Sequence, residues 1–327
     1  MTEREKHGRS EPLVIGHRGA PGYRPEHTRS SYELAFEMGA DAVEPDLVAT
    51  RDGVLVVRHE NEISGTTDIA DRPEFAHRRT TKSFAGHEVT GWFTEDFTWD
   101  ELATLFCRER IPEIRPGNVP YDDAEPMLRL QDVLDIAREN GVGVVVEIKH
   151  APYFASIGLD LAPLVADELI AAGWQDPDRV GSLVIESFEE SALRAVRERG
   201  IRARFVYLLE QTGAALDLLL AHGSGAPTYR DQLNDVAGLA DRFDGISVHK
   251  NLLLAGDTEF AARAIDAGLD LFTWTCRPEN AFLARRFRTP GGRSAFGEWR
   301  AEWDEIRRSG VTGVFADHPD LAREVFG

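Results

Sequence analysis

The sequence predicts an α/β fold, a (β/α)8 TIM barrel, and three observations support that prediction. Eight short runs rich in apolar and β-branched residues, each typical of a buried strand, are distributed along the chain. Segments with helical periodicity separate most of them, and strands that alternate with helices indicate a parallel sheet. A chain of 327 residues can close such a sheet in one unit, so we expect a single domain over residues 1–327.

The predicted strands run from near the start of the chain to near its end. They are residues 13–17, 42–48, 144–149, 182–188, 203–209, 244–249, 269–274 and 312–317. Ser30 and Glu33 fit a capping box at the start of the first helix, and Gly39, Gly141 and Gly200 fit helix ends. The sequence TRDG at 50–53 stands between two β-rich runs, which predicts a hairpin that returns His59 beside Glu44.

Residues 60–127 do not follow the alternating pattern. They contain several Pro and Gly residues, and the stretch is too long for an ordinary connection. We therefore expect an insertion that lies over the C-terminal face of the barrel. Its aromatic residues form either a groove for an acyl chain or, more commonly, a small core of their own; they are Trp92, Phe93, Phe97 and Trp99.

Composition excludes several classes of partner. The net charge of −19 repels nucleic acid and anionic membranes, and no apolar run approaches the ~20 residues of a membrane span. We therefore expect no nucleic-acid partner and no stable membrane insertion, and the sequence does not predict an oligomeric state. The N-terminus is charged and lacks an apolar signal segment, which favours the cytoplasm, although a secreted chain that had lost its signal would give the same pattern. Cys107 and Cys276 are far apart, which predicts neither a disulfide nor a metal site.

Acidic residues recur where the predicted strands end, which is where barrels of this kind build their sites. Glu44 and Asp46 are two residues apart, as are Glu147 and Lys149, so each pair shares a face of its strand. Taken alone, either pair is more often an ion pair or a solvated strand edge. Three carboxylates that converge in an apolar barrel mouth need a compensating cation, and oxygen ligands suit Mg²⁺ or Ca²⁺. The sequence therefore predicts one divalent cation.

Two histidines are expected near the same place. His17 ends the first predicted strand and His59 ends the returning hairpin, and an opposed pair of imidazoles can supply one base and one acid. Arg18 and Lys149 add positive charge that suits a phosphate, or else they form ion pairs with neighbouring glutamates. Trp274 either packs over a substrate or closes the barrel interior. His249 is a candidate rim residue.

The ordered motifs of the chain resemble one enzyme family. They are HRG, PE-x-T, E-x-D, TRDG, VVRH, VEIK, SF, FTWT and GVTGVFADHP, and they extend from Leu13 to Pro319. Each motif is weak alone, but their order and spacing are similar to those of the glycerophosphodiester phosphodiesterase family, in particular its larger bacterial type with an insertion after the second histidine. The resemblance implies a TIM barrel that hydrolyses glycerophosphodiesters to glycerol 3-phosphate and an alcohol, with a divalent cation.

The resemblance also implies roles for individual residues. His17 and His59 would be the acid/base pair, Arg18 and Lys149 would hold the phosphate, and Trp274 is a candidate substrate contact. Metal ligands would be Glu44, Asp46 and Glu147, with Glu26 near the metal or behind its ligands. Gly19 and Gly22 would let the backbone approach the ligand. The chain departs from the family pattern at Pro45 inside E-x-D, at His27 in place of Asn, and at Glu60 in place of Asp.

The sequence does not identify the attacking oxygen. It is either water or the glycerol 2-hydroxyl, and the second route passes through a cyclic phosphate.

Two alternative functions also remain open at this point. A related enzyme of phospholipase D-like or lyase type would act on lysophospholipids and release that cyclic product. A barrel that only binds a phosphorylated ligand is the third reading, because fold does not guarantee function, and the presence of both histidines and all three carboxylates argues against it.

Overall fold

The computed structural model describes residues 11–84, 87–175, 183–256 and 259–327. The N-terminal segment that favoured the cytoplasm, residues 1–10, lies outside the described residues, as does Ser182 at the start of one predicted strand. No helix in the described ranges combines the length and the apolar character needed to cross a bilayer.

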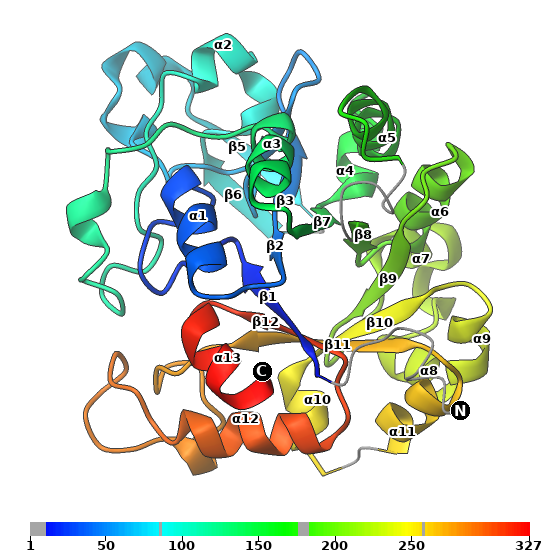
Figure 1. The fold of residues 1–327 in the computed structure, drawn as a ribbon. Helices are drawn as coiled ribbons and strands as arrows, with labels where there is room; N and C mark the ends of the chain where they lie inside the picture. Colours follow the sequence, from blue (N-terminus) through cyan, green and yellow to red (C-terminus); the bar gives the residue numbers. More distant parts are fainter. Residues whose placement is uncertain (1–10, 85–86, 176–182, 257–258) are drawn as a thin grey trace.

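A closed parallel barrel forms the centre of the molecule (Figure 1). Its strands follow the order β2-β1-β12-β11-β10-β9-β8-β7, and a β2–β7 pairing closes the ring. Apolar side chains fill its interior, including Ile15, Val145 and Phe315, because the strands are buried on both faces. This architecture confirms the predicted (β/α)8 barrel. The barrel strands are β1 (Leu13–His17), β2 (Ala42–Glu44), β3 (Asp46–Ala49), β7 (Gly143–Ile148), β8 (Leu183–Ser187), β9 (Arg204–Leu209), β10 (Gly245–His249), β11 (Asp270–Cys276) and β12 (Gly313–Ala316).

The predicted strand 42–48 is in fact two strands, β2 and β3, that share one barrel position. Pro45 divides them because it has no N–H to donate to a neighbouring strand. Its carbonyl still accepts a hydrogen bond from the Glu147 N–H at 3.0 Å, so β3 continues alongside β7. The division leaves Glu44 and Asp46 on either side of the break, at the end of the barrel where the site forms.

The predicted hairpin is confirmed. β3 pairs antiparallel with β4 (Leu55–Val57), and Gly53 takes the positive φ of +79° that the turn requires. The Arg58 N–H then donates to the Asp46 carbonyl at 2.9 Å. His59 consequently emerges beside Asp46, two residues further along the chain than the predicted neighbour Glu44.

Helices surround the barrel and fill the spaces outside the strands (Figure 1). Gly39, Gly141 and Gly200 follow helix ends with positive φ, as predicted. The predicted cap at Ser30 is wrong: Thr28 caps α1 by accepting from the Ser31 N–H, since the chain becomes helical one residue before Ser30. The α-helices outside residues 60–127 are α1 (Arg29–Glu37), α3 (Leu130–Asn140), α4 (Ala151–Ser156), α5 (Leu161–Ala171), α6 (Glu190–Glu198), α7 (Leu216–His222), α8 (Tyr229–Asn234), α9 (Val236–Ala240), α10 (Lys250–Leu254), α11 (Glu259–Asp266), α12 (Trp299–Arg308) and α13 (Pro319–Phe326), with 3-10 helices η7 (Gly223–Gly225) and η8 (Arg285–Phe287).

Residues 60–127 form short elements that lie beside α1, β2 and β3, the first elements of the chain (Figure 1). The Asn118 amide donates to the Pro21 carbonyl at 2.9 Å, which places this part of the segment over the C-terminal end of β1. This agrees with the predicted insertion over that face. Its elements are η2 (Ile69–Asp71), η3 (Pro73–Arg78), β5 (Thr80–Phe84), β6 (His87–Gly91), η4 (Thr94–Asp96), α2 (Trp99–Leu102) and η5 (Val119–Tyr121).

The aromatic residues of this segment pack into the protein interior. Phe93 and Phe97 are fully buried, Trp92 is nearly so, and the Trp92 indole N–H donates to the Phe75 carbonyl at 2.8 Å. None of these three lines the central cavity described below. Trp99, the fourth residue of the group, is half-buried against the same core and does not line the cavity either. The group is therefore a packing core, which was the more common of the two interpretations.

Candidate active site

A cavity of about 970 Å³ opens at the C-terminal ends of the barrel strands. It brings together seven of the residues singled out from the sequence, from four barrel strands and the hairpin. Asp46 is buried beneath it, and Glu26 lines a small adjoining pocket. The seven are His17, Arg18, Glu44, His59, Glu147, Lys149 and Trp274.

The turn after β1 explains the glycines of the HRG motif. Arg18 and Gly19 both have positive φ, +58° and +96°. A Cβ on Gly19 would lie 2.5 Å from the Ser31 hydroxyl, and one on Gly22 would lie 2.3 Å from the His318 ring. Close packing against α1 and His318 therefore requires glycine at both positions, and the approach of this backbone to a ligand stays a prediction.

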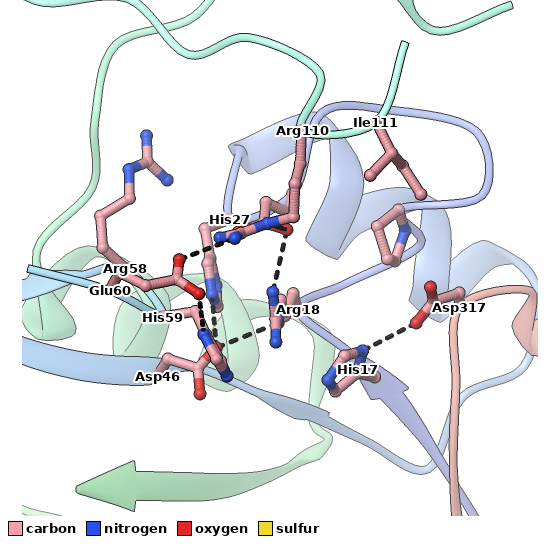
Figure 2. Close-up of polar contacts among 12 residues, drawn as sticks. His17, Arg18, His27, Asp46, Arg58, His59, Glu60, Arg110, Ile111 and Asp317 are labelled. Carbon is pink, nitrogen blue, oxygen red and sulfur yellow. Dashed lines mark hydrogen bonds and ion pairs between the residues drawn. The ribbon is translucent and has the colours of Figure 1, made fainter. Parts of the chain in front are cut away.

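His17 is held by a carboxylate that sequence reasoning missed. Its Nδ1 lies 2.7 Å from Asp317 Oδ1, and Asp317 Oδ2 accepts from Arg115 Nη2 at 2.6 Å and from Arg277 Nε at 2.7 Å (Figure 2 shows the His17–Asp317 contact). Burial alone would raise the pKa of Asp317, but Arg277 and Arg115 together hold it well below the usual range. Burial and then Arg18 lower the pKa of His17 to about 4. The imidazole is thus neutral at pH 7, with its proton on Nδ1 and its Nε2 able to accept one.

His59 has an equivalent arrangement on the opposite side. Its Nδ1 lies 2.5 Å from Glu60 Oε1, and Glu60 Oε2 lies 2.7 Å from Arg110 Nη1 (Figure 2). Burial, followed by Arg18 and Lys149, lowers the pKa of His59 to about 3. Glu60 therefore orients its histidine as Asp317 orients His17. Each imidazole has its Nδ1 engaged by a carboxylate, which leaves Nε2 for chemistry.

Two carboxylates fix Arg18, and Figure 2 marks both ion pairs with dashed lines. Its Nη1 donates to Glu26 Oε2 at 3.0 Å, and its Nε lies 3.1 Å from Asp46 Oδ2. Glu26 also accepts two hydrogen bonds from Arg110, at 2.6 and 2.7 Å. Glu26 thus contacts two arginines, and its relation to a metal ion stays a prediction.

His27, which replaces the Asn of the family pattern, holds Asp46. The ring is fully buried and the residue has a positive φ of +58°. Its Nε2 lies 3.0 Å from Asp46 Oδ2 and its Nδ1 lies 2.7 Å from the Tyr32 hydroxyl. Burial lowers the pKa of His27, so the neutral ring donates from Nε2 to Asp46 and accepts the Tyr32 proton at Nδ1. His27 therefore supplies the buried Asp46 with a hydrogen-bond donor.

Three buried glutamates converge at the base of the cavity. Glu44, Glu147 and Glu186 each offer a carboxylate oxygen, and these atoms all lie within 4.8 Å of one another. Glu44 Oε1 and Glu186 Oε2 have no hydrogen-bond partner among the described residues. Burial first, and then neighbouring carboxylates, raise the pKa of Glu44 and Glu186 well above the usual range, while burial raises that of Glu147 to about 8. Such a donor set fits a hard divalent cation, which would replace the protons.

Asp46 lies next to this cluster along the barrel. It pairs with Glu147 in the β3–β7 register, and its Oδ1 lies 3.3 Å from Lys149 Nζ. Burial would raise the pKa of Asp46, but Lys149 and Arg18 hold it well below the usual range. The Asp46 carboxylate is therefore ionised between two cations. Glu147 also has a cationic neighbour, because Lys149 Nζ donates to its Oε1 at 2.6 Å. No Lys or Arg side chain among the described residues forms an ion pair with Glu44 or Glu186.

Comparison with known proteins identifies the family. The model of the glycerophosphoryl diester phosphodiesterase family matches residues 17–321. The chain belongs to this family. It is 27% identical over 337 aligned positions to the glycerophosphodiester phosphodiesterase GDPD6 of Arabidopsis thaliana, covering 94% of this chain and 84% of the relative.

Two further comparisons bear on the fold and on chain length. The glycerophosphodiester phosphodiesterase of Haemophilus influenzae is 28% identical over 223 positions, which cover 62% of this chain but only 58% of the relative. A phosphodiesterase of Oleispira antarctica, whose structure contains the product sn-glycerol-3-phosphate, superposes with a TM-score of 0.60 at 18% identity and covers 99% of each chain. The second comparison shows the shared fold.

The sequence analysis did not predict several residues of the site. Glu186 is the second-last residue of β8 and Asp317 directly follows β12, so the strand-end argument that selected Glu147 would also have found them. Arg110 and Arg115 stand in an irregular stretch where no periodicity signals their direction. They reach the site only because residues 60–127 fold over it.

Trp274 and His249 lie on the cavity wall. Trp274 packs edge-on against Phe188 and His249, with ring centroids 5.8 and 4.9 Å apart. It also rests on the apolar interior of the barrel. Trp274 therefore caps the interior and faces the cavity at once, so both interpretations of this residue describe part of its position.

Proposed function

We propose that this protein hydrolyses glycerophosphodiesters to glycerol 3-phosphate and an alcohol, and that it uses one Mg²⁺ or Ca²⁺ ion. The observation that carries the proposal is the pair of imidazoles in one cavity, each held at Nδ1 by a carboxylate, above a cluster of buried glutamates and beside Arg18. Acid/base groups, fixed positive charge and a cation site are the three parts that hydrolysis of a phosphate diester needs.

Glu44 and Glu147 would hold the cation with Glu186, and Asp46 stands beside them as a fourth candidate ligand. When bound, the cation would polarise the phosphate oxygens and stabilise the charge that develops on them. Arg18 and Lys149 would bind the remaining phosphate oxygens with charge-assisted hydrogen bonds. Because Glu26 and Asp46 fix the Arg18 guanidinium, the phosphate would be oriented without reordering of that side chain.

His17 and His59 would move the protons. The Nε2 of one removes a proton from the attacking oxygen, and the other, protonated in the substrate complex, gives a proton to the leaving alkoxide. Both rings are neutral in the free protein, so the negative phosphate is the group that would favour the protonated form of the acid.

The proposal is tested with purified full-length protein and glycerophosphocholine, glycerophosphoethanolamine and lysophosphatidylcholine, each with Mg²⁺, Ca²⁺ or EDTA. Phosphorus NMR of the products separates glycerol 3-phosphate from a cyclic phosphate. We expect glycerol 3-phosphate from the two water-soluble diesters and loss of turnover in EDTA. Preference for the lysolipid with release of a cyclic phosphate would establish the lyase reading instead, and tight binding without turnover would establish the binding reading.

Replacement of Arg110 by Ala is expected to raise KM about tenfold, because Glu26 and Glu60 each lose a charged hydrogen-bond partner. Glu26 would then bind Arg18 alone and shift it away from the phosphate. The measurement is the Michaelis profile for glycerophosphocholine. Arg108→Ala is the matched control, because Arg108 is in the same segment but pairs with Asp71 and Asp123 away from the site. Equal kinetic effects of the two substitutions would contradict a positioning role for Arg110.

A further inference from the structure

The cavity extends well beyond the phosphate-binding end. Its volume of about 970 Å³ is near the upper end of the range for small-ligand pockets, ~300–1,000 Å³. Residues 277–288, which follow β11 and which we call the arginine loop, form one wall of the extension. In Figure 1 this orange segment lies between β11 and α12. The extension is where the alcohol part of a diester would lie if its phosphate were at Arg18.

The arginine loop is a fixed structure. The Asn280 amide donates to the carbonyls of Thr289 and Gly292, both at 2.9 Å, and the Ala284 N–H donates to Glu302 Oε2 at 2.7 Å. Arg288 Nε donates to the Leu283 carbonyl at 2.8 Å. These bonds tie the loop to itself and to α12, so the side chains it presents to the cavity start from a defined backbone.

The loop concentrates positive charge on the cavity wall of a protein with a net charge of −19. Arg277, Arg285, Arg286 and Arg288 all line the cavity. Asp317 compensates Arg277 and Glu305 compensates Arg286. Among the described residues, no carboxylate forms an ion pair with Arg285 or Arg288. These two guanidinium groups are permanently charged and offer the fork of donors that binds phosphate well.

Two further carboxylates line the same cavity. They are Glu189 and Glu210. Burial raises the pKa of Glu189 to about 7, and its Oε2 accepts from the Ser187 hydroxyl at 3.1 Å. Glu210 accepts the Gln211 N–H at 3.0 Å. Neither glutamate forms an ion pair among the described residues. Because Glu189 is partly protonated near pH 7, the positive charge of Arg285 and Arg288 exceeds the negative charge of these two carboxylates.

We propose that the arginine loop is a subsite for a second phosphate, carried on the alcohol part of the substrate, with Arg285 and Arg288 as its ligands. This inference rests on the proposed function and names its substrate class: glycerophosphodiesters whose alcohol bears a phosphate group. A cationic alcohol such as choline would face the arginine loop without a compensating charge.

The test compares two substrates that differ only in that group, glycerophosphoinositol and glycerophosphoinositol 4-phosphate. For the wild-type protein we expect kcat/KM to be at least tenfold higher for the phosphorylated substrate, and the ratio to fall as NaCl is raised because exposed charges are screened. The double variant R285A/R288A should reduce the ratio to about one and leave glycerophosphoinositol hydrolysis unchanged. Arg293→Ala is the matched control, since Arg293 is exposed, lies on the same β11–α12 connection and does not line the cavity.

Binding of both compounds, measured by calorimetry on the wild type and R285A/R288A, separates this inference from the proposed function. Turnover of both substrates at equal kcat/KM would overturn the subsite and leave the hydrolase intact. Tighter binding of the phosphorylated compound without turnover would overturn the hydrolase and leave the subsite intact; no turnover and no difference in binding would overturn both. Inorganic phosphate is the last comparison. If it inhibits at concentrations similar to the KM of the phosphorylated substrate, and if R285A/R288A weakens both to the same extent, the loop binds free phosphate and the substrate assignment is overturned.

Discussion

Alanine at position 17 is expected to lower kcat by about three orders of magnitude, within the range that one positioned proton-transfer group contributes. His17 lines the cavity and Asp317 holds its Nδ1, so Nε2 is the ring nitrogen left for proton transfer. No other imidazole among the described residues pairs with Asp317. The measurement is single-turnover hydrolysis of glycerophosphocholine with a saturating divalent cation. His249→Ala is the control, because His249 also lines the cavity and no carboxylate among the described residues forms an ion pair with its ring. Full activity of the His17 variant would remove the acid/base proposal.

Asp317→Asn tests how His17 is held. The variant keeps the imidazole but loses the charge that raises the pKa of His17 against burial and Arg18, so that pKa should fall further below about 4. If His17 is the base, the acidic limb of kcat/KM moves to lower pH; if it is the acid, the basic limb moves. Either shift, with kcat reduced about a hundredfold, assigns the role that static geometry leaves open. An unshifted profile would contradict the positioning role of Asp317. The melting temperature reports the cost of leaving Arg277 without its ion-pair partner and Arg115 with Glu279 alone.

Local sequence signals predicted the barrel because each strand carries its own pattern. β7 is a continuous apolar run up to Glu147, and a strand buried on both faces needs no information from distant residues to be recognised. The TRDG turn is equally local, since the positive φ of Gly53 determines it. The division at Pro45 is also a local effect, since proline lacks the N–H that a strand needs. It was not predicted because the apolar pattern of 42–48 is typical of one continuous strand.

The site could be predicted only as far as it is built from strand ends. His17, Glu44 and Glu147 follow from their positions, because parallel strands bring their C-terminal ends together. The contacts of Arg110 and Arg115 could not be predicted in the same way. Each depends on the path of an irregular segment that brings residues more than 80 positions apart into contact, as in the Arg110–Glu26 pair.

We also expect a large effect of the carboxylate cluster on the free energy of unfolding. Burial raises the pKa of Glu147 from 4.5 to about 8, so the folded protein keeps a proton that the unfolded chain has released. The associated stability is complete below pH 4.5 and is lost as pH rises through 8. His17 and His59, whose pKa values are lowered, act in the opposite direction below their ordinary pKa near 6.5. Between pH 6.5 and 8 the metal-free protein should lose up to about 2 kcal/mol for this one group. Glu168 and Glu189, whose pKa is raised to about 7, lose stability in the same window, so the part due to Glu147 is the difference in pH slope between the wild type and Glu147→Gln.

A divalent cation should abolish that loss, because it compensates the ionised carboxylates and binds only the folded cluster. At a hundredfold excess over Kd it would stabilise the fold by about 2.7 kcal/mol, or about 5 °C in Tm. Thermal melts at pH 6.5 and 8, with EDTA, Mg²⁺ or Ca²⁺, measure both effects without any substrate. Glu147→Gln should reduce the pH slope and remove the response to metal, and Glu186→Gln should weaken that response because it removes one of the three converging oxygens. Glu139→Gln, on the exposed end of α3, should behave as the wild type; an unchanged melt in Mg²⁺ and Ca²⁺ at pH 8 would show that these glutamates hold no cation.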